Sequence, residues 1–465
     1  MRVELRKSIF VFIYIIIFAI SFLFLPKIET FRNMSIAGTI IIIILLILNF
    51  LYTKKLLTPI NIIFLCFILF QYGLPILYAI DPNYSNWYLQ QMSTSSLINN
   101  NFFSIICIET FAFGLIIAKK KQKEVEVKNN FLSDSNNKMI FSFSKLLLII
   151  TGVIAIPLGL YVSYLGIIHG YNYVKMDSMH IYNGITRFAQ EFFVAANILC
   201  IVFSNNKQSK RTYMILALVY AIILIFSGAR TMSLAIILVL VFVKSEDDIK
   251  SKAKRTIFIA LGIVLLAFIG SMVAEQRLNG NVSNSSIIKT TESVVEEMGF
   301  NFTTINFVES FVPSTKNYQY GITYIKSILC LIPKTLDPTN TIENINRTLP
   351  EFELSDWLAS KYGNLYSFGV GYSVIAEAYY NFGFFGFISV FIQGLIIGKI
   401  MGNSNDKNKT KFQKYVEYIL LFALLTYPRR SFLTLLKCIE YYIVFIILAI
   451  FLISQRNRKI RGNKE

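Results

Sequence analysis

Long apolar runs constrain the fold of this chain more than any other feature. A helix needs about 20 mostly apolar residues to cross the hydrocarbon core of a bilayer, which is about 30 Å thick. Runs of about this length recur along the whole sequence, at 8–25, 34–52, 60–80, 102–118, 144–166, 188–204, 256–274, 383–400, 414–428 and 433–454. With 55% hydrophobic residues among 465, the sequence predicts an all-α polytopic membrane protein.

The stretch 212–243 is too long for one ordinary span. It contains the short polar string "SGAR" at 227–230, and a break there gives two antiparallel helices. This hairpin brings the expected number of transmembrane helices to about twelve.

Basic residues set the orientation, because cytoplasmic loops hold most of the lysine and arginine of a membrane protein. With both termini in the cytoplasm, the inner segments carry 30 of the 45 Lys and Arg residues. If 212–243 were a single span, the basic run "KSEDDIKSKAKR" would face outside, so the hairpin is preferred. The net charge of +18 is then explained by topology and lipid headgroups, and nucleic acid is not an expected partner.

Three regions follow from this topology. Residues 1–274 form a membrane domain of nine helices, and residues 366–465 add three helices and a basic cytoplasmic tail. Between them, 275–365 is one large extracytoplasmic loop with short surface helices.

The first run is expected to stay in the protein, since no small-residue cleavage site follows it. The five cysteines are scattered without metal-site spacing, and neither a metal nor a cofactor is predicted.

Arginines on the expected outer side are the first candidates for a site. The apolar arms of the hairpin, 213–226 and 232–243, reach only about 21 and 18 Å, so Arg230 at its tip would lie below the outer membrane surface. A guanidinium at that depth needs a polar cavity or an anion, or else it extends to the headgroups.

A second basic pair, Arg429 and Arg430, follows Pro428 at the outer end of another span. Planar guanidinium groups bind phosphate in a bidentate fashion, so these arginines suggest an outward-facing anion pocket. Arg187 and Arg277, at the ends of outer helices, are weaker candidates. Any of these arginines would equally pair with loop carboxylates.

Glu377 is the main candidate for proton transfer. It stands alone among apolar and aromatic residues in "GVGYSVIAEAYYNFGFFG", 369–386, where a carboxyl group either pairs with a cation or holds its proton more strongly than usual, and either outcome is useful to an enzyme. The glycines of this string equally suit close helix packing. Glu297 and His180, both in outer loops, are weaker candidates for a proton acceptor.

These motifs, "SGART" at 227–231, the long outer loop and the glycine-rich string at 369–386, together resemble Wzy-type polysaccharide polymerases. The resemblance implies a membrane glycosyltransferase of O-antigen or capsule assembly at the outer face of the cytoplasmic membrane. It would move a growing glycan from undecaprenyl diphosphate onto an incoming lipid-linked oligosaccharide repeat unit. A flippase and a chain-length regulator are the partners implied.

In this hypothesis Arg230, Arg429 and Arg430 stabilise the departing diphosphate, and Glu377 accepts the proton of the acceptor hydroxyl or orients the site. Two alternatives use the same features: a transporter or flippase of lipid-linked oligosaccharides, and a ligase-like transferase that hands finished chains to another acceptor. The absence of an internal repeat argues against the transporter.

Overall fold

The described part of the chain contains helices joined by turns and loops, and no strands. The computed structural model describes residues 2–53, 58–118, 134–169, 184–227, 229–248, 298–332, 372–401 and 410–444, together with residues 292, 295, 296, 446, 447, 450, 451 and 455. Seven helical segments in these residues are long and apolar enough to cross a membrane, one of them the interrupted segment Val374–Met401. Two shorter apolar helices lie at Phe188–Phe203 and Met232–Lys244. The predicted polytopic helical class is confirmed.

The chain divides into two compact units. The first contains Met1–Gln122, Ser286–Asn405 and Leu424–Lys437, and the second contains Lys123–Ser285, Asp406–Ala423 and Cys438–Glu465. Each unit therefore combines segments that are far apart in the sequence. The region boundaries predicted at 274/275 and 365/366 lie outside the described residues.

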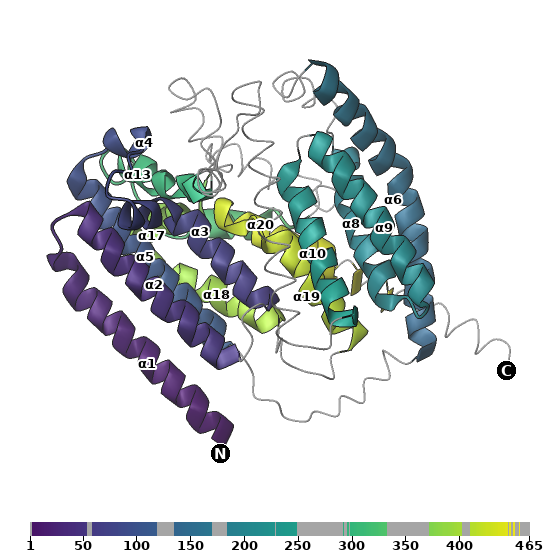
Figure 1. Cartoon of the computed structure of the whole chain (residues 1–465), viewed down its shortest axis with the longest axis horizontal. Coiled ribbons are helices and arrows are strands. Elements are labelled where there is room, and N and C mark those ends of the chain that lie inside the picture. The colour runs from purple at the N-terminus through teal and green to yellow at the C-terminus, as the bar shows by residue number, and fades with distance from the viewer. Residues whose placement is uncertain are drawn as a thin grey trace. The chain divides into compact units, whose positions relative to one another are not determined.

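Four long helices and one helix of 15 residues build the first unit (Figure 1). They are α1 (Arg2–Phe24), α2 (Phe31–Thr53), α3 (Pro59–Ile80), α5 (Thr94–Ile117) and α18 (Phe387–Met401). Shorter helices join them: η1 (Leu25–Lys27), α4 (Trp87–Gln90), η3 (Phe300–Phe302), α13 (Thr303–Glu309), α14 (Ile322–Leu329), α17 (Val374–Phe382), η5 (Gly383–Gly386) and η6 (Tyr427–Arg429).

Burial separates the inner helices of this unit from its surface. Thr58 and Ser93 cap the starts of α3 and α5 with their side-chain oxygens, and these two helices are buried along most of their length. By contrast α1 exposes large apolar side chains such as Phe12 and Leu23. An exposed apolar face on a helix long enough to span is what lipid contact requires.

The second unit contains α6 (Asp134–His169), α8 (Gly184–Phe203), α9 (Lys207–Phe226) and α10 (Arg230–Asp248), with most of α19 (Lys411–Leu424). The chain re-enters it within α20 (Phe432–Ile439), which continues as the π-helical η7 (Glu440–Val444). Asn206 caps α9, since its side chain accepts a hydrogen bond from the backbone N–H of Gln208.

The predicted break in the stretch 212–243 is confirmed. α9 ends at Phe226 and α10 begins at Arg230, and the Ser233 hydroxyl donates a hydrogen bond of 2.7 Å to the carbonyl oxygen of Ala221 across the hairpin. The length expected for the first arm of the hairpin was too short. α9 has 20 residues, about 30 Å, because the helix already begins at Lys207 and includes the polar residues before Tyr213. Helix length alone therefore does not require a recessed tip.

Other predicted spans differ in their bounds. The span predicted at 102–118 begins a full two turns earlier, at Thr94, and that predicted at 144–166 belongs to a helix of 36 residues. Polar residues lengthen both helices beyond the apolar run. The span predicted at 256–274 lies outside the described residues.

Close backbone contact holds α5 against α18. A Cβ atom added to Gly394 would lie 2.4 Å from the carbonyl oxygen of Phe111, and one added to Gly114 would lie 2.5 Å from that of Phe391. The two helices thus approach through paired glycines, as small residues allow in membranes. This contact fixes the position of α18, which follows the candidate active site directly.

We expect Gly394→Ala to lower the stability of the protein by about 1–3 kcal/mol, because the added methyl group meets backbone that has no room to move. Thermal unfolding in detergent measures this. Gly152→Ala on α6 is the matched control, since the nearest atoms to its Cβ belong to side chains and not to backbone, the closest being a Phe193 ring carbon at 3.1 Å. Equal stability of the Gly394→Ala variant and wild type would contradict the packing described.

Candidate active site

The helix α17 carries Glu377 and is held at both ends. At its start the Ser373 hydroxyl accepts a hydrogen bond of 3.0 Å from the backbone N–H of Ala376, and Thr304 donates to the same hydroxyl at 2.8 Å. At its end Gly383 adopts φ +56°, which favours glycine. The chain then folds back, so that a Cβ on Gly386 would lie 2.4 Å from the carbonyl oxygen of Ala378. α17 is therefore a separate short helix that ends in a sharp turn before α18.

The Glu377 carboxyl group is buried, with 1% of the residue exposed, and both its oxygens accept hydrogen bonds. Oε1 accepts from the Thr323 hydroxyl at 2.8 Å, and Oε2 accepts from the backbone N–H of Phe432 at 2.6 Å. Bonds of this kind to a carboxylate are among the stronger hydrogen bonds in proteins. Glu377 thus links three segments that are distant in sequence.

Asn381, one turn after Glu377, completes the network. Its side-chain nitrogen donates to the Thr323 hydroxyl at 2.6 Å and to the carbonyl oxygen of Glu377 at 2.8 Å. Its side-chain oxygen accepts from the backbone N–H of Gly321 at 3.0 Å. Every bond is buried, so the network orders α14 rigidly against α17.

The helix α14 turns its polar face inward. It buries Thr323, Lys326 and Ser327 and leaves Ile322, Ile325 and Ile328 exposed. Burial lowers the pKa of Lys326, as expected for an amine removed from water. The exposed isoleucines are typical of a helix in contact with an apolar medium.

The predicted arginine pair lies on a turn that is fixed at three points. The Gln71 side chain of α3 donates to the carbonyl oxygen of Pro428 at 2.5 Å, and the buried Tyr427 hydroxyl donates to Gln393 of α18. The Glu377 carboxyl group then holds the N–H of Phe432. We call residues 427–432 the arginine turn.

Within the arginine turn the two guanidinium-bearing residues differ in exposure. Tyr427 and Pro428 are buried, Arg429 is partly exposed and Arg430 is exposed. The backbone of Arg430 is extended, at φ −136° and ψ 172°. A rigid turn that presents cationic side chains from a buried base is suited to binding an anion with little loss of entropy.

The structure brings together one part of the predicted site. Glu377, Arg429 and Arg430 belong to the same hydrogen-bonded arrangement in the first unit. Arg230 begins α10 and Arg187 lies in α8, both in the second unit, and their side chains are outside the described residues. Arg277, Glu297 and His180 lie entirely outside them, so their roles stay predictions.

Sequence reasoning missed the residues that hold the site in place. Gln71 and Gln393 are amides inside apolar spans, and a polar group in such a place usually has a specific partner. That signal was present in the sequence. Asn381 is four residues after Glu377 and so shares its helix face, which the sequence also shows. Thr323 and the N–H of Phe432 carry no such signal, because only tertiary contact brings them to the carboxyl group.

A second buried carboxyl group, Glu109 on α5, was also missed. It is 3% exposed, and the hydroxyl of Ser21 on α1 donates to its Oε1. Its Oε2 has no hydrogen-bond partner among the described residues. Glu109 ties α1 to α5 within the first unit.

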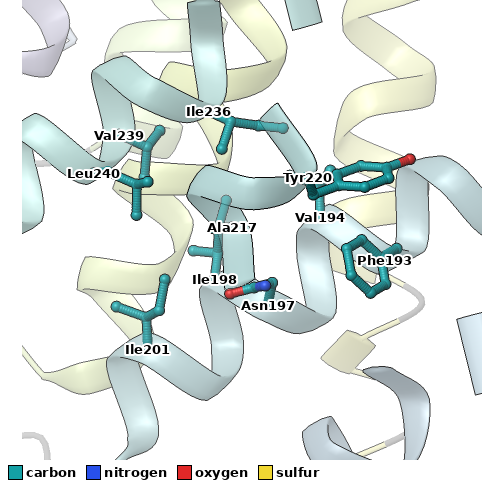
Figure 2. A pocket seen from close by; sticks show the side chains of 10 residues that line it. All are labelled: Phe193, Val194, Asn197, Ile198, Ile201, Ala217, Tyr220, Ile236, Val239 and Leu240. Atoms are coloured by element: carbon teal, nitrogen blue, oxygen red, sulfur yellow. The ribbon is translucent and has the colours of Figure 1, made fainter. Parts of the chain in front are cut away.

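An apolar cavity in the second unit is a different kind of feature. Ten residues from α8, α9 and α10 line it, and Figure 2 shows the Asn197 amide among side chains such as Ile198 and Ala217. Asn197 is 2% exposed, and neither polar atom of its side chain has a hydrogen-bond partner in the described part of the chain. The lining contains no carboxylate, imidazole or basic group, so we assign no catalysis to this cavity.

The described residues do not form a metal site. They contain no group of three His, Cys, Asp or Glu side chains arranged to hold a metal ion. The chemical groups that the candidate site offers are the guanidinium groups of Arg429 and Arg430 and the buried carboxyl group of Glu377, which is hydrogen-bonded to the same turn.

The fold and the site define a multi-pass helical membrane protein with two arginines on a hydrogen-bonded turn. Comparison with known families is more specific: residues 7–459 match the model of the family described as O-antigen polysaccharide polymerase Wzy. The chain belongs to this family. Searches among curated proteins and among solved structures found no match.

Membership confirms the resemblance drawn from the motifs. The protein is a glycosyltransferase-type polymerase of polysaccharide biosynthesis, acting on lipid-linked oligosaccharide repeat units in a bacterial membrane. The flippase and ligase alternatives are not supported by this family.

We expect Phe432→Pro to disconnect Glu377 from the arginine turn. Proline is tolerated here because Phe432 is the first residue of α20, where the N–H has no helical partner. Loss of this hydrogen bond leaves a buried acceptor unsatisfied and should cost about 1–3 kcal/mol, measured by thermal unfolding, and chain growth should fall with it.

Phe432→Ala is the matched control for this change. It removes the ring, which contacts that of Tyr324 at 5.2 Å, but keeps the N–H. If Phe432→Ala reduced chain growth as much as Phe432→Pro, the ring and not the hydrogen bond would be the important contact.

Proposed function

We propose that the protein transfers a growing glycan from undecaprenyl diphosphate to the terminal sugar of an incoming lipid-linked repeat unit, at the outer face of the cytoplasmic membrane. The observation that carries this proposal is the arginine turn, which a buried carboxyl group and two amides fix in place. A lipid diphosphate is the leaving group that such a turn fits.

The reaction needs stabilisation of negative charge more than any other assistance. A hydroxyl oxygen of the acceptor sugar forms a bond to the anomeric carbon of the donor, and the bond from that carbon to the diphosphate oxygen breaks. The diphosphate leaves with the electron pair, and the hydroxyl proton passes to the departing phosphate or to a nearby base. Preorganised cations at the developing charge lower this barrier, and Arg429 and Arg430 have that role in our proposal.

Glu377 acts as a positioning residue in this mechanism. Its two oxygens are occupied by Thr323 and by the N–H of Phe432, and the residue is 1% exposed. A general base must reach the proton that it removes, and a carboxyl group enclosed in this way serves instead to hold the backbone beside the arginines.

The remaining candidates complete the proposal. On the sequence alone, Arg230 stays a further candidate for binding a diphosphate, and Arg187 and Arg277 stay weaker ones. If a proton acceptor is needed, Glu297 or His180 provides it from an outer loop. We further propose that a flippase supplies the lipid-linked units and that a separate protein regulates chain length.

We expect Arg430→Ala to reduce chain growth about 100- to 1,000-fold, the usual effect of removing one group that stabilises charge in a transition state. Membranes supplied with purified lipid-linked repeat unit give a ladder of chain lengths on a gel, which measures this. Arg430→Lys should also lose most activity, because a single ammonium group does not reproduce the bidentate fork.

Arg32→Ala is the matched control, since Arg32 is another exposed arginine of the first unit, at the start of α2. It should leave the ladder unchanged. Normal chain lengths from folded Arg430→Ala protein would overturn the assignment of the diphosphate to the arginine turn.

A further inference from the structure

Three tyrosines gather where the end of α17 meets the segment before α14. The ring of Tyr318 lies 6.5 Å from that of Tyr320 and 6.2 Å from that of Tyr379, measured between centroids. Tyr320 is 74% exposed, and the other two are partly exposed. We call this group the tyrosine platform.

The backbone fixes the tyrosine platform in place. The N–H of Gln319 donates to the carbonyl oxygen of Tyr380 at 3.0 Å, and the N–H of Tyr320 donates to that of Asn381 at 2.9 Å. The Tyr318 ring lies directly on Gly383, where a Cβ would come within 2.9 Å of it. Residues 318–320 are therefore held on the end of α17 by main-chain hydrogen bonds. These bonds do not depend on which side chain stands at position 320.

Tyr320 has a backbone conformation that this residue type rarely adopts. Its φ is +46°, in the left-handed region, which is unfavourable for a residue with a bulky side chain. Glycine would relieve this cost, and so would asparagine in part. An exposed tyrosine kept in such a conformation indicates that its ring has a use outside the fold.

A carboxylate borders the tyrosine platform. Glu309, at the end of α13, lies within electrostatic range of the Tyr379 hydroxyl. Its Oε2 accepts hydrogen bonds from Asn100 at 2.7 Å and from the Ser96 hydroxyl, which orient the group. Its Oε1 accepts no hydrogen bond from the described residues, and Glu309 is partly exposed to solvent.

We propose that the tyrosine platform and Glu309 form a saccharide-binding subsite, an inference that rests on the proposed function for the identity of its ligand. Aromatic rings bind the C–H face of a sugar, and an oriented carboxylate accepts hydrogen bonds from sugar hydroxyls. The carboxylate repels phosphate, so the subsite binds the glycan and not the lipid diphosphate.

The subsite holds sugars away from the reacting bond. Tyr379 and Glu377 are two residues apart on α17, so their side chains point about 200° apart around the helix. One face of α17 thus supports the arginine turn, and the other belongs to the tyrosine platform. When the subsite binds sugars of the glycan that do not react, it positions the sugar that does react.

Binding of lipid-free glycan fragments tests the subsite separately from catalysis. The probes are fragments of one to three repeat units, cut by partial hydrolysis from the polysaccharide that the source bacterium makes. The full-length protein in lipid nanodiscs is titrated with them, and saturation-transfer difference NMR measures binding. We expect wild type to bind, and Tyr320→Leu to bind about five- to tenfold more weakly, since stacking on an aromatic ring is worth about 1 kcal/mol.

Two further variants separate stacking from a general structural effect. Tyr320→Phe keeps the ring and should bind within about twofold of wild type. Glu309→Gln should weaken binding because an amide is a poorer acceptor than a carboxylate. Tyr164→Leu, at an exposed tyrosine of α6 in the second unit, is the matched control and should change nothing.

The outcomes distinguish this inference from the proposed function. No saturation transfer to wild type, or equal binding by wild type and Tyr320→Leu, overturns the subsite. Arg430→Ala should still bind the fragments while chain growth is lost. If Arg430→Ala keeps normal chain growth and Tyr320→Leu loses fragment binding, the subsite stands and the role proposed for the arginine turn falls.

Discussion

The hydrogen bond from the N–H of Phe432 to the Glu377 carboxyl group is the interaction on which the candidate site depends. It joins α17 to the start of α20, and through Thr323 the same carboxyl group holds α14. A buried carboxyl group is costly unless it is fully bonded. The three segments that supply or receive these bonds are therefore constrained together, and Arg429 and Arg430 share this rigidity because they precede Phe432 closely in the same turn.

This arrangement assigns different tasks to the two faces of α17. Glu377 and Asn381 face the network that fixes the arginine turn, and Tyr379 faces the tyrosine platform beside Glu309. In our proposal the polymerase binds a charged lipid carrier and a polar glycan at the same time. The proposed cationic and anionic binding groups lie on either side of one short helix, which keeps each group from neutralising the other.

Much of the fold could be predicted from sequence because lipid imposes a simple pattern. Seven helical segments among the described residues are long and apolar enough to span, and the break at "SGAR" occurs where a polar string interrupts an apolar one. Helix ends were predicted less well, as at Thr94 and Lys207, because polar turns continue a helix beyond the apolar run. Glu377 and the arginine pair were found because charged residues are conspicuous beside apolar spans.

The hydrogen-bond partners of Glu377 could not be read from sequence, since both come from remote segments and one of them is a backbone N–H. The tyrosine platform was missed for a related reason. Tyrosines are common in this chain, with 26 of them, and only the fold places Tyr318, Tyr320 and Tyr379 together. A residue type that is abundant carries little information until its position is known.

Whether Glu377 acts through the arginine turn is tested most directly by a mutant cycle between Glu377→Gln and the paired change Arg429→Ala with Arg430→Ala. The rate of chain growth is measured for wild type, the Glu377→Gln variant, the paired arginine variant and the variant with all three changes, all as folded protein in membranes. If Glu377 only positions the turn, adding Glu377→Gln to the paired arginine variant should reduce the rate by less than about twofold, so the effects are strongly non-additive. If the two reductions instead multiply, Glu377 contributes independently of both arginines, and its role as a positioning residue for the arginine turn is contradicted.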